Sequence, residues 1–283
     1  MTLPGVAFTA LAAAAARAVE TSRADRLVED PFAAAFVAAA PSPVPLPTRW
    51  PDDDATLTDQ ETLLLLGANY VGLRTRFFDD VLRDADQVVL LAAGLDTRAF
   101  RLAWPDGATV FELDRPDVLA FKTTVLAGHT ARCALVGVPA DLAGDWTTPL
   151  LDAGFDRTRP TTWIAEGLLQ YLSPQAEHDL LTAVDGLSAR GSTLAVERAL
   201  DLGDPSRLRE GSERAGIRVD RLVHGGPRAD LATWLHDRGW TAGDHPVDHV
   251  AARYDRPLLH PRLTGDTPRP QPTPAGFTTA TKG

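Results

Sequence analysis

Three acidic residues follow three predicted strands of this 283-residue chain, at the edge where a doubly wound sheet binds its ligands. Asp114 ends "TVFELD", Asp141 follows in "VPADL" and Glu166 closes "TWIAEG". Asp114 lies 20 positions after Gly94, the spacing at which an acid accepts hydrogen bonds from ribose hydroxyls. Each acid could instead cap a helix N-terminus. Together the three acids predict a negatively charged crevice that suits a cationic ligand.

The turn after the first predicted strand, "LLAAGLDTR", contains a single glycine, Gly94. A dinucleotide site needs several glycines there so that backbone N–H groups can approach a pyrophosphate, and Asp96 would repel a phosphate. The turn therefore disfavours NAD and FAD. S-adenosylmethionine carries an adenosine, a sulfonium and an ammonium but no phosphate, and it matches both the turn and the acids.

The carboxylate of such a cofactor needs a cation, and "VGLRTRFFDD" offers Arg74 and Arg76. On a helix these two side chains point to nearly opposite sides. Asp79 and Asp80 are helical neighbours of Arg76, which predicts an ordinary surface ion pair. The neighbours of Arg74 are apolar, and an arginine on a packed face needs a partner because an unpaired buried charge is costly. Arg74 is therefore the candidate for the cofactor carboxylate, with an internal ion pair as the alternative.

Short β-rich runs alternate with helical patterns through the middle of the chain and would position these residues. The runs are "QVVLLAAG", "TVFELD", "CALVGVPAD", "TWIAEG" and "STLAVERA". They are almost continuously apolar, which is typical of strands buried on both faces. The sequence predicts an α/β fold, a doubly wound, mostly parallel sheet flanked by helices, with "FTTATKG" as a last, antiparallel edge strand.

A single domain is expected over residues 1–283, because 44% hydrophobic residues can supply one large core. Residues 1–84 would form an N-terminal helical cap, with a helix from Gln60 to about Asp84 and a proline-rich connector or lid before it. Residues 85–199 would form the cofactor-binding core. Residues 200–283 would supply a polar cap insertion from Leu200 to Gly226, then the C-terminal part of the core with a helix in "PRADLATWLHDRGW".

The composition limits which binding partners and which cellular compartment are expected for this chain. The formal net charge of −10 argues against nucleic acid, and no uncharged apolar stretch approaches the roughly 20 residues that span a bilayer. The lone Cys133 excludes an internal disulfide, and the protein is expected to be soluble and cytoplasmic. His245 and His249 in "HPVDHV" lack an evident third ligand, so no metal is expected. The oligomeric state is left open.

The sequence resembles the leucine carboxyl methyltransferase-like family of class I S-adenosylmethionine-dependent methyltransferases, which has a Rossmann-like fold and many actinobacterial members. The matching pieces include "EDPFAAAFV", "RTRFFDD", "LAAGLDTRAFRL", "FELDRPDVLAFK", "PADL" and "WIAEGLLQYLSP". The resemblance implies that Gly94 lets the turn approach the cofactor and that Asp114 binds the ribose. It also implies that Asp141 and the backbone of Leu142 hold the adenine.

The same resemblance implies that Arg74 pairs with the cofactor carboxylate and that Glu166 lies near the methionine ammonium. Tyr171 in "LLQYL" matches a position near the acceptor, although the residue taken alone is better explained as a helix-packing aromatic. His224, beside "GG", is the histidine expected to reach an acceptor, with a solvated loop position as the alternative. The family usually has glycine where this chain has Ala92, and the alanine is expected to tighten the pocket.

Methyl transfer from a sulfonium is an in-line displacement that depends mainly on alignment. A carboxylate acceptor is ionised at neutral pH and needs no base, whereas a phenol, with a pKa of ~10, benefits from a base such as histidine. The expected function is O-methyl transfer to a small-molecule carboxylate. Phenolic O-methylation, a catalytically silent cofactor-binding partner protein and, less favoured, a nicotinamide-dependent oxidoreductase are the rivals. The family's namesakes modify a protein C-terminus and bacterial relatives tailor polyketides, so the acceptor class stays open.

Overall fold

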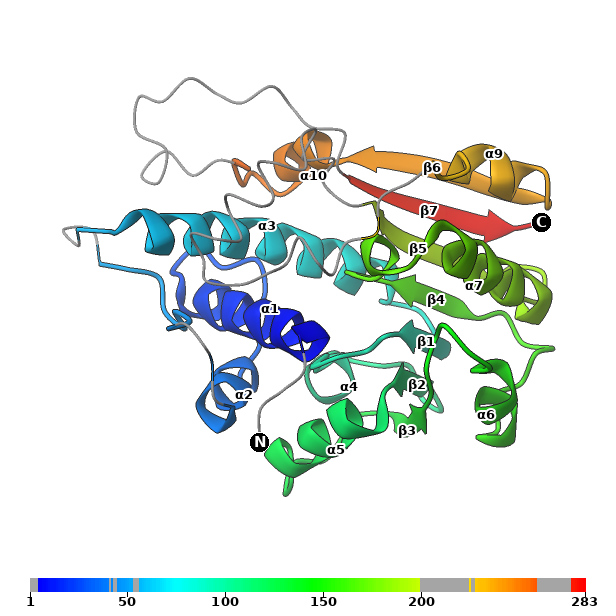
Figure 1. Cartoon of the computed structure of the whole chain (residues 1–283), viewed down its shortest axis with the longest axis horizontal. Helices are drawn as coiled ribbons and strands as arrows, with labels where there is room; N and C mark the ends of the chain where they lie inside the picture. Colours follow the sequence, from blue (N-terminus) through cyan, green and yellow to red (C-terminus); the bar gives the residue numbers. More distant parts are fainter. Residues whose placement is uncertain are drawn as a thin grey trace.

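A seven-stranded sheet with the order β3-β2-β1-β4-β5-β7-β6 forms the centre of the computed structural model, which describes residues 5–40, 42, 45–52, 56–198, 224, 227–258 and 276–283 (Figure 1). β1 to β5 are parallel, and β7 runs antiparallel between β5 and β6. The strands are β1 (Gln87–Leu91), β2 (Thr109–Asp114), β3 (Ala134–Pro139), β4 (Thr162–Ala165), β5 (Thr193–Arg198), β6 (Trp240–Pro246) and β7 (Gly276–Lys282).

Helices connect and cover these strands, and local sequence sets where they begin. α3 begins with a reciprocal capping box between Thr58 and Glu61, and α7 begins after the cap residue Ser173 with proline at its first position. The helices are α1 (Gly5–Ser22), α2 (Ala33–Ala39), α3 (Asp59–Val81), α4 (Arg98–Arg101), α5 (Pro116–Val125), α6 (Thr147–Asp152), the 3₁₀ helix η1 (Leu169–Tyr171), α7 (Pro174–Leu187), α9 (Leu231–His236) and α10 (Val247–Arg253).

Both faces of the sheet are buried, as alternate residues of β1 demonstrate. Val89 and Leu91 pack into a core shared with α6, α7 and α9, whereas Val88 and Leu90 pack into a second core shared with α3 and α10. Side chains alternate along a strand, so a strand with apolar residues at every position must have a layer on each side. The prediction of a doubly wound, mostly parallel sheet flanked by helices is confirmed.

The N-terminal helix α1 packs against α3 and α2. A Cβ atom at Gly72 of α3 would lie 2.8 Å from the Glu20 carboxylate of α1, so glycine permits this close approach. A Cβ atom at Gly94 would lie 3.3 Å from the Cβ of Ala10. Helix α1 is therefore held between α3 and the turn that follows β1.

The C-terminal strands differ from the sequence prediction in one respect. β7 is antiparallel as expected, but it lies inside the sheet, because the unpredicted β6 pairs with its outer side. β6 alternates the core residues Trp240 and Ala242 with polar residues and ends at Pro246, a pattern typical of an edge strand. Apart from His224, the insertion from Leu200 to Gly226 lies outside the described residues. Within the described part, no helix is long and apolar enough to cross a membrane.

Candidate functional site

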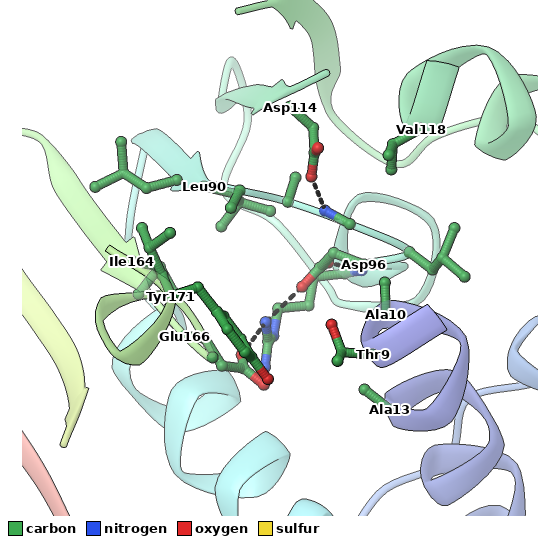
Figure 2. Close-up of a pocket in the computed structure, with 18 of the residues that line it drawn as sticks. Thr9, Ala10, Ala13, Leu90, Asp96, Asp114, Val118, Ile164, Glu166 and Tyr171 are labelled. Atoms are coloured by element: carbon green, nitrogen blue, oxygen red, sulfur yellow. Dashed lines mark hydrogen bonds and ion pairs between the residues drawn. The ribbon is translucent and has the colours of Figure 1, made fainter. Parts of the chain in front are cut away.

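A cavity lies at the carboxyl ends of β1, β2 and β4, and α1 forms its opposite wall (Figure 2). The turn from Leu91 to Asp96 forms its floor. Thr9, Ala10 and Ala13 of α1 face that turn across the cavity. Of the residues predicted from the sequence, five line the cavity: Arg74, Gly94, Asp114, Glu166 and Tyr171.

Asp114 joins the end of β2 to the turn after β1. Its carboxylate accepts hydrogen bonds from the backbone N–H of Gly94 (2.6 Å) and of Arg115 (2.7 Å). Burial raises the pKa of Asp114 above its usual value, because these backbone donors and nearby cations offset only part of the desolvation. Gly94 has a φ of 53°, a left-handed conformation that favours glycine. The predicted spacing of 20 residues thus places an acid directly against the glycine turn.

Glu166, after β4, lies between two guanidinium groups. Its carboxylate is 2.8 Å from Nε of Arg74 and 2.8 Å from Nη1 of Arg98. Burial alone would raise the pKa of Glu166, but the charges of Arg98 and Arg74 outweigh it and lower the pKa. Glu166 is therefore held ionised, as a carboxylate of low basicity.

Arg98 is the central cation of the site, and the sequence analysis missed it. It is 2% exposed and contacts three carboxylates: Asp79 at 2.7 Å, Asp96 at 2.5 Å and Glu166. Burial opposes ionisation of Asp96, but Arg98 and other cations lower its pKa to about 2. The sequence did contain a signal for this role: Arg98 comes two residues after Asp96 in a buried turn, where the acid needs a cation as partner. Asp79, predicted as a neighbour of Arg76, pairs instead with Arg98 and Arg101.

Arg74 occupies internal ion pairs, the alternative that the sequence left open. Besides Glu166, it contacts Glu197 at the end of β5, with 3.0 Å between Nη1 and Oε2. Glu197 also accepts hydrogen bonds from the Tyr70 hydroxyl (2.6 Å) and the Gly167 backbone (2.6 Å). The rule that singled out Glu166, an acid at the end of a parallel strand, applies equally to Glu197. Pairing of Arg74 with a cofactor carboxylate stays a prediction.

Tyr171 and His224, the two residues predicted to lie near the methyl acceptor, are close together in the fold, but only Tyr171 lines the cavity. Tyr171 belongs to η1 and lines the cavity beside Glu166 (Figure 2). His224 is exposed, and its backbone N–H donates to the Gln170 carbonyl oxygen (2.9 Å). The Oε1 atom of Gln170, another lining residue, is buried without a hydrogen-bond partner among the described residues.

Asp141 and Leu142 follow β3, outside the lining of this cavity. The Asp141 carboxylate accepts the N–H of Ala143 (3.0 Å) within a turn, and no helix begins there for it to cap. Leu142 packs at the margin of the core. Their part in holding an adenine remains a prediction.

The backbone at Ala92 is strained. Its φ of 55° lies in the left-handed region, which costs a residue with a Cβ about 1–2 kcal/mol. We expect Ala92→Gly to raise the free energy of unfolding by about 1 kcal/mol, measured by urea denaturation at constant slope. The control is Ala93→Gly, at a neighbour whose φ is not positive, where no gain is expected. Equal changes in both variants would contradict the strain at Ala92.

The histidines considered for a metal lie on different elements, His245 in β6 and His249 in α10. In the described part of the chain, no group of three His, Cys, Asp or Glu side chains is placed to hold a metal ion. His245 instead contacts the Thr279 hydroxyl (2.8 Å) and the Phe77 ring. Both contacts belong to the packing of β6 and β7 on α3.

Known proteins resemble this chain in sequence over most of its length. The sequence model of the family described as leucine carboxyl methyltransferase matches residues 10–185. A protein of Saccharopolyspora erythraea named as an S-adenosyl-L-methionine-dependent methyltransferase is 44% identical over 266 residues, 90% of each chain. One of Mycolicibacterium smegmatis with the same name is 42% identical over 281 residues, covering 91% of this chain and 88% of its own.

Two solved structures share the fold at low sequence identity. A Thermobifida fusca protein named as a methyltransferase superposes with a TM-score of 0.51 at 19% identity, covering 94% of both chains. A duf574 family protein of Streptomyces avermitilis superposes with a TM-score of 0.54 at 13% identity, covering 80% of this chain and 87% of its own. These two likenesses concern the fold alone.

Proposed function

The chain belongs to the leucine carboxyl methyltransferase family of S-adenosyl-L-methionine-dependent methyltransferases, and from that premise we propose that it methylates an oxygen atom of a small molecule, preferentially a carboxylate. The product is then a methyl ester. The observation that carries this proposal is the pairing of Asp96 and Glu166 with Arg98, which lowers the pKa values of both carboxylates and makes them weak bases. It is tested below by the chemistry of the product.

The cavity fits S-adenosylmethionine in charge and in hydrogen-bonding groups. Asp114 is largely buried, and its pKa is raised because the neighbouring groups offset only part of its desolvation. Hydrogen bonds donated by the ribose hydroxyls would stabilise this carboxylate. Asp96 and Glu166 supply negative charge toward the sulfonium and ammonium, and Leu90, Val118 and Ile164 supply an apolar surface.

When bound, the cofactor supplies a methyl group on a positively charged sulfur. The residues of the chain contribute binding and alignment, which account for most of the rate in an in-line displacement. Asp114 and Gly94, at the ends of β1 and β2, would hold the ribose of the cofactor. Arg74 and Glu166, on the other side of the cavity, would hold its methionine part. Tyr171, from η1, lines the cavity and is the residue that we expect to lie nearest the acceptor. Helix α1 forms one wall of the cavity, opposite the turn after β1.

Asp96 and Glu166, the two cavity acids paired with Arg98, are poorly suited to act as general bases. The pKa values of Asp96 and Glu166 are lowered by Arg98, and a base with a low pKa removes a phenolic proton, of pKa ~10, inefficiently. A carboxylate acceptor needs no proton removed. The arginines that line the cavity already pair with carboxylates of the chain, so an acceptor carboxylate would have to share them. Ester formation is favoured because it asks for no general base in the cavity.

The test is a reaction of the purified protein with isotopically labelled S-adenosylmethionine and a panel of aromatic and aliphatic carboxylic acids beside matched phenols. We expect label in products that mild alkali hydrolyses, as methyl esters are, and a lower rate in Tyr171→Phe. A turnover that stays constant as the pH rises above about 6 is also expected, because the acceptor is already ionised.

Products that alkali does not hydrolyse, as methyl ethers are, would favour the phenolic alternative. So would a turnover rate that depends on a group titrating near pH 6–7, if that dependence disappears in His224→Gln. Binding of the cofactor without transfer to any acceptor would favour a silent partner protein.

A further inference from the structure

Asp30 lies in the loop between α1 and α2, outside the lining of the cavity, and its side chain is fully buried. Its Oδ2 atom accepts hydrogen bonds from Nε of Arg17 (2.8 Å) and from the hydroxyl of Thr97 (2.7 Å). Its Oδ1 atom accepts the backbone N–H of Phe32 (3.1 Å). One carboxylate thus binds α1, the start of α2 and the loop after β1.

The two side-chain partners of Asp30 both reach the turn that forms the cavity floor. Thr97 directly follows Asp96 and precedes α4. Arg17 lines the cavity and donates from Nη2 to the Leu95 carbonyl oxygen (2.6 Å). Asp30 therefore holds both the C-terminal end of the turn, through Thr97, and helix α1 on the facing wall, through Arg17.

The hydrogen bonds continue from Thr97 to the ionic cluster of the site. Nε of Arg101 donates to the Thr97 hydroxyl (3.3 Å), and the same guanidinium binds Asp79 through two contacts of 2.7 and 2.8 Å. Asp79 also pairs with Arg98, which contacts Glu166. A continuous chain of charged and polar groups thus runs from Asp30 to Glu166 around the cavity.

We infer that Asp30 is a positioning residue of the cofactor site, which holds α1 and the turn from Gly94 to Thr97 at the separation that S-adenosylmethionine requires. The close packing of Ala10 on Gly94 supports this role, because a small shift of α1 changes the width of the cavity directly. The Asp30 carboxylate accepts from side chains at one oxygen and from the Phe32 N–H at the other, whereas an asparagine would lose the charge and oppose one of these donors with its own NH2 group. The inference rests on the proposed role of this cavity as the cofactor site.

The experiment compares Asp30→Asn with Glu20→Gln by calorimetric titration of S-adenosylhomocysteine and by thermal unfolding. Glu20 is a matched control, a buried acid on α1 paired with Arg256 at 2.9 Å, outside the cavity lining. Both variants are expected to unfold at a lower temperature. Only Asp30→Asn is expected to weaken binding, by about tenfold or more, with Glu20→Gln within about twofold of the unchanged chain.

Thr97→Val removes one bond to Asp30 and leaves the Arg17 ion pair, so it serves as a milder variant if Asp30→Asn does not fold. It is expected to weaken binding by about threefold to tenfold. Unchanged affinity in Asp30→Asn and Thr97→Val, or equal weakening in Glu20→Gln, would overturn the inference. Failure of the unchanged chain to bind S-adenosylhomocysteine would instead overturn the proposed cofactor site itself.

Discussion

Asp114→Asn is expected to weaken S-adenosylmethionine binding by at least about 100-fold while the chain stays folded. The carboxylate is expected to accept two charge-assisted hydrogen bonds from ribose hydroxyls, each worth about 1.5–3 kcal/mol, and a loss of about 1.4 kcal/mol is tenfold in affinity. The asparagine keeps the shape of the side chain and one of the bonds to the Gly94 and Arg115 backbone. Calorimetric titration measures the affinity, and circular dichroism checks the fold.

The matched control is Asp117→Asn. Asp117 lies in the first turn of α5, half-exposed and paired with Arg115 at 2.6 Å, so it resembles Asp114 in position but does not line the cavity. Its replacement is expected to leave the dissociation constant within about twofold, since exposed ion pairs contribute little. Normal affinity in Asp114→Asn would remove the ribose role from this residue.

Arg98→Met is expected to have the largest effect on stability, a loss of about 3–5 kcal/mol in the free energy of unfolding. The reason is that Asp79, Asp96 and Glu166 all lose a buried partner, and a buried carboxylate without a cation is costly. Urea denaturation measures the loss. The control is Arg83→Met, which removes an exposed ion pair with Asp80 and is expected to cost less than about 1 kcal/mol.

The pH dependence of the Arg98 variant has a definite sign. In the unchanged chain, the lowered pKa values of Asp96 and Glu166 contribute stability that is lost only as the pH falls toward them. Without Arg98, fewer cations oppose the effect of burial on Asp96 and Glu166, so we expect both pKa values to rise and stability to be lost as the pH rises through them. Arg98→Met is therefore expected to recover part of its deficit between about pH 7 and about pH 5. A deficit that is constant with pH would contradict the electrostatic role.

Much of the core fold could be predicted because its strands carry a strong pattern. β1 is buried at every position, which only a sheet covered on both faces explains. β6 was missed because it lies at the edge, where only Trp240 and Ala242 face the core and the polar residues between them give a weak signal. The place of β7 inside the sheet depends on β6, so that error followed from the first.

Site residues could be predicted where the sheet topology alone determines their position. They could not be predicted where several side chains could serve as the partner. Asp114 and Glu166 follow parallel strands and therefore reach the same edge. The pair of Arg98 with Asp96 is local and could have been inferred, but the contacts of Arg98 with Asp79 and Glu166 join segments distant in the chain. The bond between Thr97 and Asp30 does the same, and no spacing in the sequence encodes these contacts. Arg74 lies between these cases: its need for a partner was predicted, and Glu166 and Glu197 fill it in this structure.

The central claim is that the cavity beside Asp114 binds the methyl donor, and calorimetric titration of the purified protein tests it most directly. We predict binding of S-adenosylmethionine and S-adenosylhomocysteine in the micromolar range, one per chain, no binding of NADH, and loss of both signals in Asp114→Asn. Absence of binding by either compound, or binding that Asp114→Asn leaves intact, would contradict the claim.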